Sequence, residues 1–78
     1  MTAATSSITF TPRQREVVAL LAQGFSGVEI ASQLWISPRT AKAHCDALRE
    51  KLGVRRREIP FAYRQVTGRD PLTDRLAP

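Results

Sequence analysis

The chain has few of the features that cross-link a protein or anchor it in a membrane. Cys45 is its only cysteine, which excludes an internal disulfide and any metal site built from several thiolates of one chain. The longest apolar run, from Val17 to Ala22, is far too short to cross a bilayer. The first seven residues lack the basic and apolar stretches of a secretory leader. We therefore expect a cytoplasmic protein that uses no metal or cofactor.

The chain is also short, and this limits its chemistry. Its 78 residues form one small domain, and a domain of this size hides only about 60% of the surface that its unfolded chain exposes. A deep substrate cavity is not expected. His44 and Cys45 could suggest a nucleophile pair or metal ligands, but neighbouring helical residues point about 100° apart, and no third ligand or orienting carboxylate is evident. We predict no catalytic residue, and we expect a packed or phosphate-adjacent histidine instead.

Acidic residues are scarce in one part of the chain. The net charge is +5, residues 1–38 and 65–78 each sum to zero, and residues 39–64 carry eight basic and three acidic side chains. One segment therefore supplies the whole excess of positive charge and could present a face that binds a polyanion. Charge alone leaves an ordinary solvated basic surface equally open.

Clear start and stop signals predict the first helix. Thr11 is a good N-cap, a proline follows it at the first helical position, and Gln14 at N3 can reach back to the cap amide. Apolar residues then recur at helical spacing, and Gly24 supplies a left-handed stop. We expect a helix from residue 12 to about residue 23.

Two further helices follow after short connections. Ser26 and Glu29 form a second capping box, which begins a helix of about two turns. Ser37 and the proline after it begin a third helix, expected over 38–52 and ended by Gly53. The inward positions of this third helix are apolar or small, namely Ala41, Cys45, Leu48 and Leu52.

A fourth helix is predicted near the C-terminus. Because Pro60 lacks an amide hydrogen, it belongs in the first turn, so the helix begins at about Arg57 to Ile59 and ends near Gly68. Its helically spaced apolar residues are Ile59, Ala62, Tyr63 and Val66. Asp70 and the proline after it could cap one short extra turn. The fold class is thus all-α: a compact four-helix domain over 10–68, between a flexible lead-in at 1–9 and a tail at 69–78.

The second and third helices have the lengths and spacing of a helix-turn-helix, whose second helix can enter a DNA major groove. The groove is about 12 Å wide and accepts a helix with its side chains. The Ser37 cap, the free backbone amides and the helix dipole would face a phosphate, and Arg39 and Thr40 lie in the same first turn. Trp35 in the turn is expected to cover the junction of the two helices, with an exposed anchor for a partner as the alternative.

Several motifs together resemble a known bacterial family. They are Thr11-Pro12-Arg13-Gln14-Arg15-Glu16-Val17-Val18, Leu20-Leu21-Ala22-Gln23-Gly24, Glu29-Ile30-Ala31, Ile36-Ser37-Pro38-Arg39-Thr40-Ala41-Lys42-Ala43-His44 and Lys51-Leu52-Gly53-Val54. Over about residues 10 to 66 the chain resembles the LuxR/GerE-type, NarL-like DNA-binding domain. The resemblance implies a four-helix domain in which the third helix reads DNA and the fourth pairs two copies.

The resemblance also implies roles for single residues. Lys42, Ala43 and Asp46 would lie near bases and phosphates, and Arg39 and Thr40 would contact the DNA backbone. With the Ser37 cap and the outward or basic-turn residues, the predicted DNA-binding set is Ser37, Arg39, Thr40, Lys42, Ala43, Asp46, Arg49, Arg55 and Arg56. Ile59, Ala62, Tyr63 and Val66 would divide between the core and the dimer interface.

The chain departs from the family pattern at several positions. Gly27 and Val28 stand where a polar residue followed by Lys or Arg is common, so one phosphate anchor is missing. Asp46 brings a negative charge to the reading face, where it could accept a hydrogen bond from cytosine, face solvent, or pair with Arg49. Arg56 stands where a cap such as Ser is usual, and Pro60 is also unusual.

We therefore predict a sequence-specific regulator of transcription that binds double-stranded DNA as a homodimer on inverted half-sites. RNA polymerase is a further possible partner, and the chain is expected to be either a stand-alone regulator or part of a longer protein. The alternative is a protein-interaction module, in which Trp35, Phe61 and the apolar tail residues Leu72 and Leu76 bind another regulator or RNA polymerase.

Overall fold

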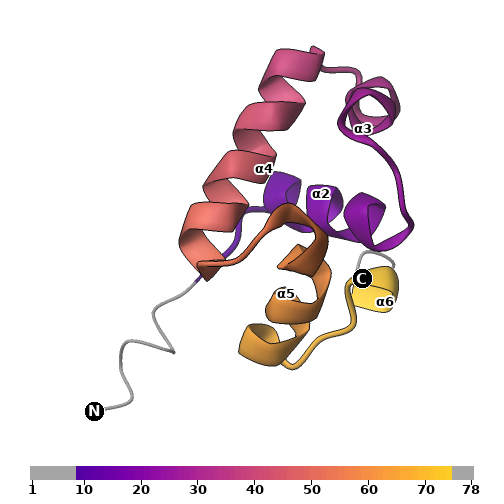
Figure 1. The fold of residues 1–78 in the computed structure, drawn as a ribbon. Helices are drawn as coiled ribbons and strands as arrows, with labels where there is room; N and C mark the ends of the chain where they lie inside the picture. The colour runs from indigo at the N-terminus through magenta and orange to yellow at the C-terminus, as the bar shows by residue number, and fades with distance from the viewer. Residues whose placement is uncertain (1–8, 75–78) are drawn as a thin grey trace.

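The computed structural model describes residues 9–74, which contain helices and no strand (Figure 1). In chain order the elements are α2 (Pro12–Ala22), α3 (Gly27–Leu34), α4 (Pro38–Leu52), the short 3-10 helix η1 (Arg56–Glu58), α5 (Ile59–Thr67) and α6 (Pro71–Asp74). The expected all-α class, the four main helices and the extra C-terminal turn are confirmed. The lead-in expected at residues 1–9 lies outside this range except for Thr9, and so does Leu76.

Local capping explains where α2 and α3 begin. The Thr11 hydroxyl accepts from Gln14 N while Gln14 Oε1 accepts from Thr11 N, both at 3.0 Å. Ser26 and Glu29 make the same reciprocal pair at the start of α3. Each box satisfies amides that have no partner within their own helix. Because these contacts join residues three positions apart, the sequence alone predicts the starts of these helices.

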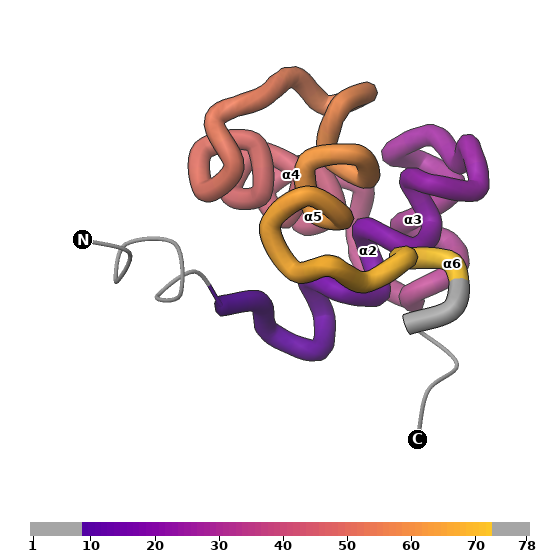
Figure 2. Tube along the Cα trace, turned by 90° about the horizontal axis from the view of Figure 1, so that it is seen from below, coloured from indigo at the N-terminus to yellow at the C-terminus, as the bar shows by residue number. Residues whose placement is uncertain are grey.

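The hydrophobic core lies between α2 and the helices packed around it. In Figure 1, α4 is the long helix on one side, α3 lies near its N-terminal end, and α5 lies below α2. Seen from below in Figure 2, α5 and α6 lie on the near side, and α2 contacts α3, α4, α5 and α6. The buried core residues are Val17, Val18 and Leu20 of α2, Ile30, Ala31 and Leu34 of α3, Ala41, Cys45 and Leu48 of α4, and Ile59 and Tyr63 of α5.

The chain just before α2 is held against the last turn of α4. Lys51 Nζ donates to Thr9 O at 2.6 Å and to Gln14 Oε1 at 3.0 Å. It also lies 5.1 Å from the centroid of the Phe10 ring, a distance at which a cation and an aromatic face attract each other. The Phe10 ring in turn meets Tyr63 edge-on, with ring centroids 4.9 Å apart. Lys51 therefore has a structural role.

Trp35 does not cover the helix junction as expected. Its side chain is 93% exposed, and its backbone has φ 59° and ψ 41° as the left-handed C-cap of α3. Among the residues that the structure describes, it is the one non-glycine residue with positive φ. The left-handed backbone that ends α3 explains the difference, because it turns the chain sharply before α4 and directs the indole outward.

This strained position gives a stability prediction. We expect Trp35→Gly to raise the free energy of unfolding by about 0.5–1 kcal/mol, because relief of left-handed strain outweighs the entropy that a glycine adds to the unfolded chain. Urea unfolding followed by circular dichroism measures it. Trp35→Phe, which keeps the strain, should leave the stability unchanged, and a destabilised glycine variant would show that the indole makes stabilising contacts.

Candidate nucleic-acid interface

The N-terminal end of α4 is open to solvent and carries a side-chain cap. Thr40 N donates to Ser37 Oγ at 3.0 Å, and the Ser37 hydroxyl donates to Thr40 Oγ1 at 3.0 Å. Ser37, Pro38, Arg39 and Thr40 are all exposed. The positive end of the helix dipole favours an anion at such a terminus. The geometry therefore allows a DNA phosphate to approach this end of α4.

The two faces of α4 are sharply different. Ala41, Cys45 and Leu48 are buried against the rest of the domain, whereas Lys42 and Ala43 face solvent. The Lys42 side chain is 76% exposed. A helix held from behind in this way can present its outer side chains to a partner without disturbing the core.

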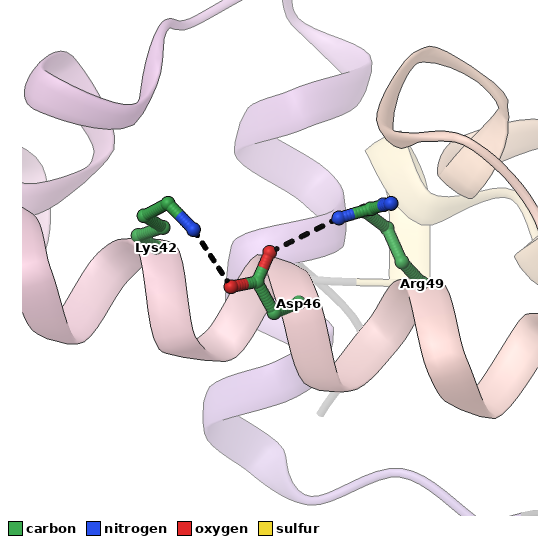
Figure 3. A network of polar contacts seen from close by, with 3 residues as sticks. All are labelled: Lys42, Asp46 and Arg49. Atoms are coloured by element: carbon green, nitrogen blue, oxygen red, sulfur yellow. Dashed lines mark hydrogen bonds and ion pairs between the residues drawn. The ribbon is translucent and has the colours of Figure 1, made fainter.

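Three charged side chains on the outer face of α4 form a network, which we call the Asp46 triad (Lys42, Asp46 and Arg49). Lys42 Nζ donates to Asp46 Oδ2 at 3.0 Å, and Arg49 Nη1 donates to Asp46 Oδ1 at 3.2 Å (Figure 3). The hydrogen bond from Lys42, together with the positive charges of Lys42 and Arg49, holds the pKa of the Asp46 carboxyl below its usual range. The pairing with Arg49 was one of the alternatives from the sequence. The pairing with Lys42 was not anticipated, although a spacing of four residues on a helix is a signal for it.

The basic turn after α4, which carries Arg55 and Arg56, lines the same groove as the outer face of α4. A groove of about 570 Å³ is lined by the start of α3, by α4 and by Arg55 and Arg56. Arg56 reaches the start of α3, because a Cβ placed on Gly27 would lie 3.7 Å from Arg56 Nη2. The predicted DNA-binding residues that line this groove are Lys42, Asp46, Arg49, Arg55 and Arg56. Ser37, Arg39, Thr40 and Ala43 are exposed but do not line it.

The residues predicted for the dimer interface separate into two classes. Ile59 and Tyr63 are buried in the core of the subunit, so their side chains are not available to a second copy in this structure. Packing of α5 against α2 and α4 explains this. Ala62 and Val66 are partly exposed, and Phe61 on the same helix is 67% exposed.

Cys45 lies on the buried face of α4, and this burial raises the pKa of its thiol above the ordinary value. A raised pKa keeps the thiol protonated and unreactive at neutral pH. Among the side chains that the structure describes, no group of three or more from His, Cys, Asp or Glu could hold a metal ion. No helix in the described part of the chain has the length and apolar character needed to span a bilayer.

The sequence of this chain is similar to those of known bacterial regulatory proteins. A family model described as "Bacterial regulatory proteins, luxR family" matches residues 8–59. The transcriptional regulatory protein UhpA of Salmonella typhimurium is 43% identical over 58 residues, which cover 74% of this chain and 29% of UhpA. The spore germination protein GerE of Bacillus subtilis is 47% identical over 47 residues, which cover 60% of this chain and 64% of GerE.

A third relative is much longer than this chain. The putative HTH-type transcriptional regulator Rv0890c of Mycobacterium tuberculosis is 43% identical over 44 residues, which cover 56% of this chain and 5% of that protein. This chain thus spans less than two thirds of the length of each of these relatives. The comparison with solved structures found no significant match.

Proposed function

Because the chain belongs to the luxR family of bacterial regulatory proteins, we propose that it is a sequence-specific DNA-binding regulator whose α4 lies in the major groove. One observation carries this proposal: α4 has a buried apolar face, an exposed cationic face and an open, capped N-terminus. In a helix-turn-helix, the second helix uses such a face to contact base edges. Regulation of this kind would take place in the bacterial cytoplasm, where the chromosome lies.

The predicted DNA-binding residues have different proposed contacts, according to their positions on α4 and the turn that follows it. The N-terminus of α4, with Arg39 and Thr40, holds a phosphate and sets the register of the helix. Lys42 and Ala43 face the base edges, where a lysine donates to guanine and a small apolar side chain accommodates a thymine methyl group. The remaining basic residues, Arg49, Arg55 and Arg56, neutralise phosphates along the rim of the groove.

A homodimer is the proposed binding form. The half-exposed Ala62 and Val66, with the exposed Phe61, give α5 an apolar surface that a second copy could cover. Two copies related by a twofold axis would place two α4 helices in successive major grooves, on inverted half-sites about 34–36 Å apart or a multiple of that distance. RNA polymerase is a further proposed partner.

Selection from a random DNA pool tests the proposal directly. The purified domain should enrich duplexes that share an inverted repeat, and the spacing of the repeat reports the dimer geometry. Gel shifts at low and moderate salt should then give a saturable complex with the selected duplex. A pool without any enriched sequence, together with no saturable complex at low salt, would refute the proposal.

Lys42 gives a residue-level prediction. We expect Lys42→Ala to weaken binding to the selected duplex by about 1–3 kcal/mol and to relax the preference at one base position, because a direct base contact is lost. Fluorescence anisotropy with the selected duplex and its single-base variants measures both effects. Arg15→Ala, which removes the same charge from α2, is the matched control and should have a much smaller effect. An unchanged affinity of the Lys42 variant for every duplex would reject the base contact.

A protein-interaction module is the second candidate, and two exposed side chains favour it. Trp35 is 93% and Val28 67% exposed, and large apolar side chains of this kind often anchor protein partners. Trp35 is the only tryptophan of the chain, so its fluorescence reports directly on what covers it. A module of this kind would show no saturable DNA complex, and its tryptophan emission would shift on adding purified RNA polymerase.

A further inference from the structure

Asp46 uses both of its carboxylate oxygens to hold cations of its own helix. Oδ2 accepts from Lys42 at 3.0 Å and Oδ1 accepts from Arg49 at 3.2 Å (Figure 3). The three side chains are 76%, 41% and 49% exposed in the order Lys42, Asp46 and Arg49. The Asp46 triad thus lies on the surface of α4, within reach of a bound duplex.

The Asp46 carboxylate also lies among cationic residues that line the groove. Among the residues that line the groove between α3, α4 and the basic turn, four are cationic, and Asp46 is the acidic one. A carboxylate and a phosphate are both anionic oxygen acceptors that take hydrogen bonds from the same lysine and arginine donors. DNA phosphates therefore compete with Asp46 for Lys42 and Arg49.

This competition does not act equally on all DNA. Exposed ion pairs are weak, so the carboxylate weakens phosphate contacts without blocking them. A non-specific duplex is held almost entirely through phosphates, and it has to displace Asp46 while lying close to its negative charge. A matching duplex adds base contacts on the same face, including cytosine N4, from which a carboxylate can accept a hydrogen bond.

We propose that Asp46 is a specificity-determining residue that competes with DNA phosphates for Lys42 and Arg49, and that it weakens non-specific binding more than operator binding. This inference rests on the proposed function. Asp46 makes the binding free energy of non-specific DNA less favourable, and disfavouring the competing complex is a recognised way to gain specificity.

Two variants with the same charge change test the inference. Asp46→Asn and Glu50→Gln each remove one negative charge from α4, but Glu50 is exposed and forms no ion pair among the described residues. We expect Asp46→Asn to strengthen binding to a random-sequence duplex by about tenfold at low salt and to reduce the ratio of operator to random affinity. For the random-sequence duplex, freeing Lys42 and Arg49 should also steepen the log-log salt dependence by up to about 1.8 per subunit, at about 0.9 for each phosphate neutralised. Glu50→Gln should change the affinity only a few-fold and leave the salt slope unaltered.

The outcomes separate this inference from the proposed function. Equal effects of the two variants would overturn it, because general charge would then explain them. Weaker operator binding by Asp46→Asn, with random-duplex binding unchanged, would also overturn it and would identify Asp46 as a base reader. Failure of the wild-type domain to bind any duplex would instead refute the proposed function itself. Asp46→Ser should reproduce the asparagine result, and thermal unfolding checks that each variant is folded.

Discussion

Raising the salt concentration from about 50 to about 200 mM should weaken binding of the dimer to its operator by about 10⁵-fold. Seven basic side chains per subunit are exposed on α4 or in the turn and short helix η1 that follow it, namely Arg39, Lys42, Arg49, Lys51, Arg55, Arg56 and Arg57. If each subunit neutralises about four to five phosphates, the log-log slope is about −8 for the dimer. Fluorescence anisotropy with a labelled operator over a series of potassium chloride concentrations gives the slope.

The contribution of a single residue to the log-log salt slope can also be measured. Replacing Arg55 by Gln should make the slope shallower by about 0.9 per subunit if this side chain neutralises one phosphate. Arg64→Gln on α5 is the control, since it removes an exposed arginine from outside the groove, and it should leave the slope unchanged. A binding constant that barely responds to salt would contradict the assignment of this face to DNA phosphates.

The second large effect is on stability, and it concerns the packing of α4 against the rest of the domain. Leu48→Ala should lower the free energy of unfolding by about 2–5 kcal/mol, because Leu48 is fully buried and truncating a buried leucine leaves a cavity. A domain of this size has a total stability of roughly 4–12 kcal/mol. The variant should therefore lose a large part of its stability, and specific DNA binding should fall at temperatures where it unfolds. Urea unfolding followed by circular dichroism measures the change.

Leu72→Ala makes the same chemical change at a site that is 46% exposed. It should cost less than about 1 kcal/mol, because little apolar surface is newly exposed to water. Similar costs at both positions would show that Leu48 does not carry the packing of α4. The difference between the two variants thus measures how firmly α4 is packed against the rest of the domain.

Helix boundaries were predictable because their causes are local. The capping residues Thr11, Ser26 and Ser37 act on amides within three positions, and Gly53 ends α4 with a φ of 68°, which a glycine adopts without strain. The buried face of α4 was predictable for a related reason, since helical periodicity alone groups its apolar residues.

What the sequence left open or missed depends on packing between distant segments. The stripe Ile59, Ala62, Tyr63 and Val66 was expected to divide between the core and the dimer interface, and only packing against other helices shows that Ile59 and Tyr63 lie in the core. Trp35 has the composition of a buried cover residue, but its left-handed backbone directs it outward. The periodicity of a single segment shows that one face is apolar, but it does not show whether the same subunit or a second copy covers that face.

The contacts of Lys51 have a mechanical consequence. This side chain links the backbone at Thr9 and the side chain of Gln14 to the last turn of α4, in addition to the direct contacts between α2 and α4. A pull on the backbone at Thr9 would therefore reach α4 both through the Lys51 ammonium group and through α2. Lys51→Met, which keeps most of the length of the side chain and removes its charge, would remove the first connection and leave the second.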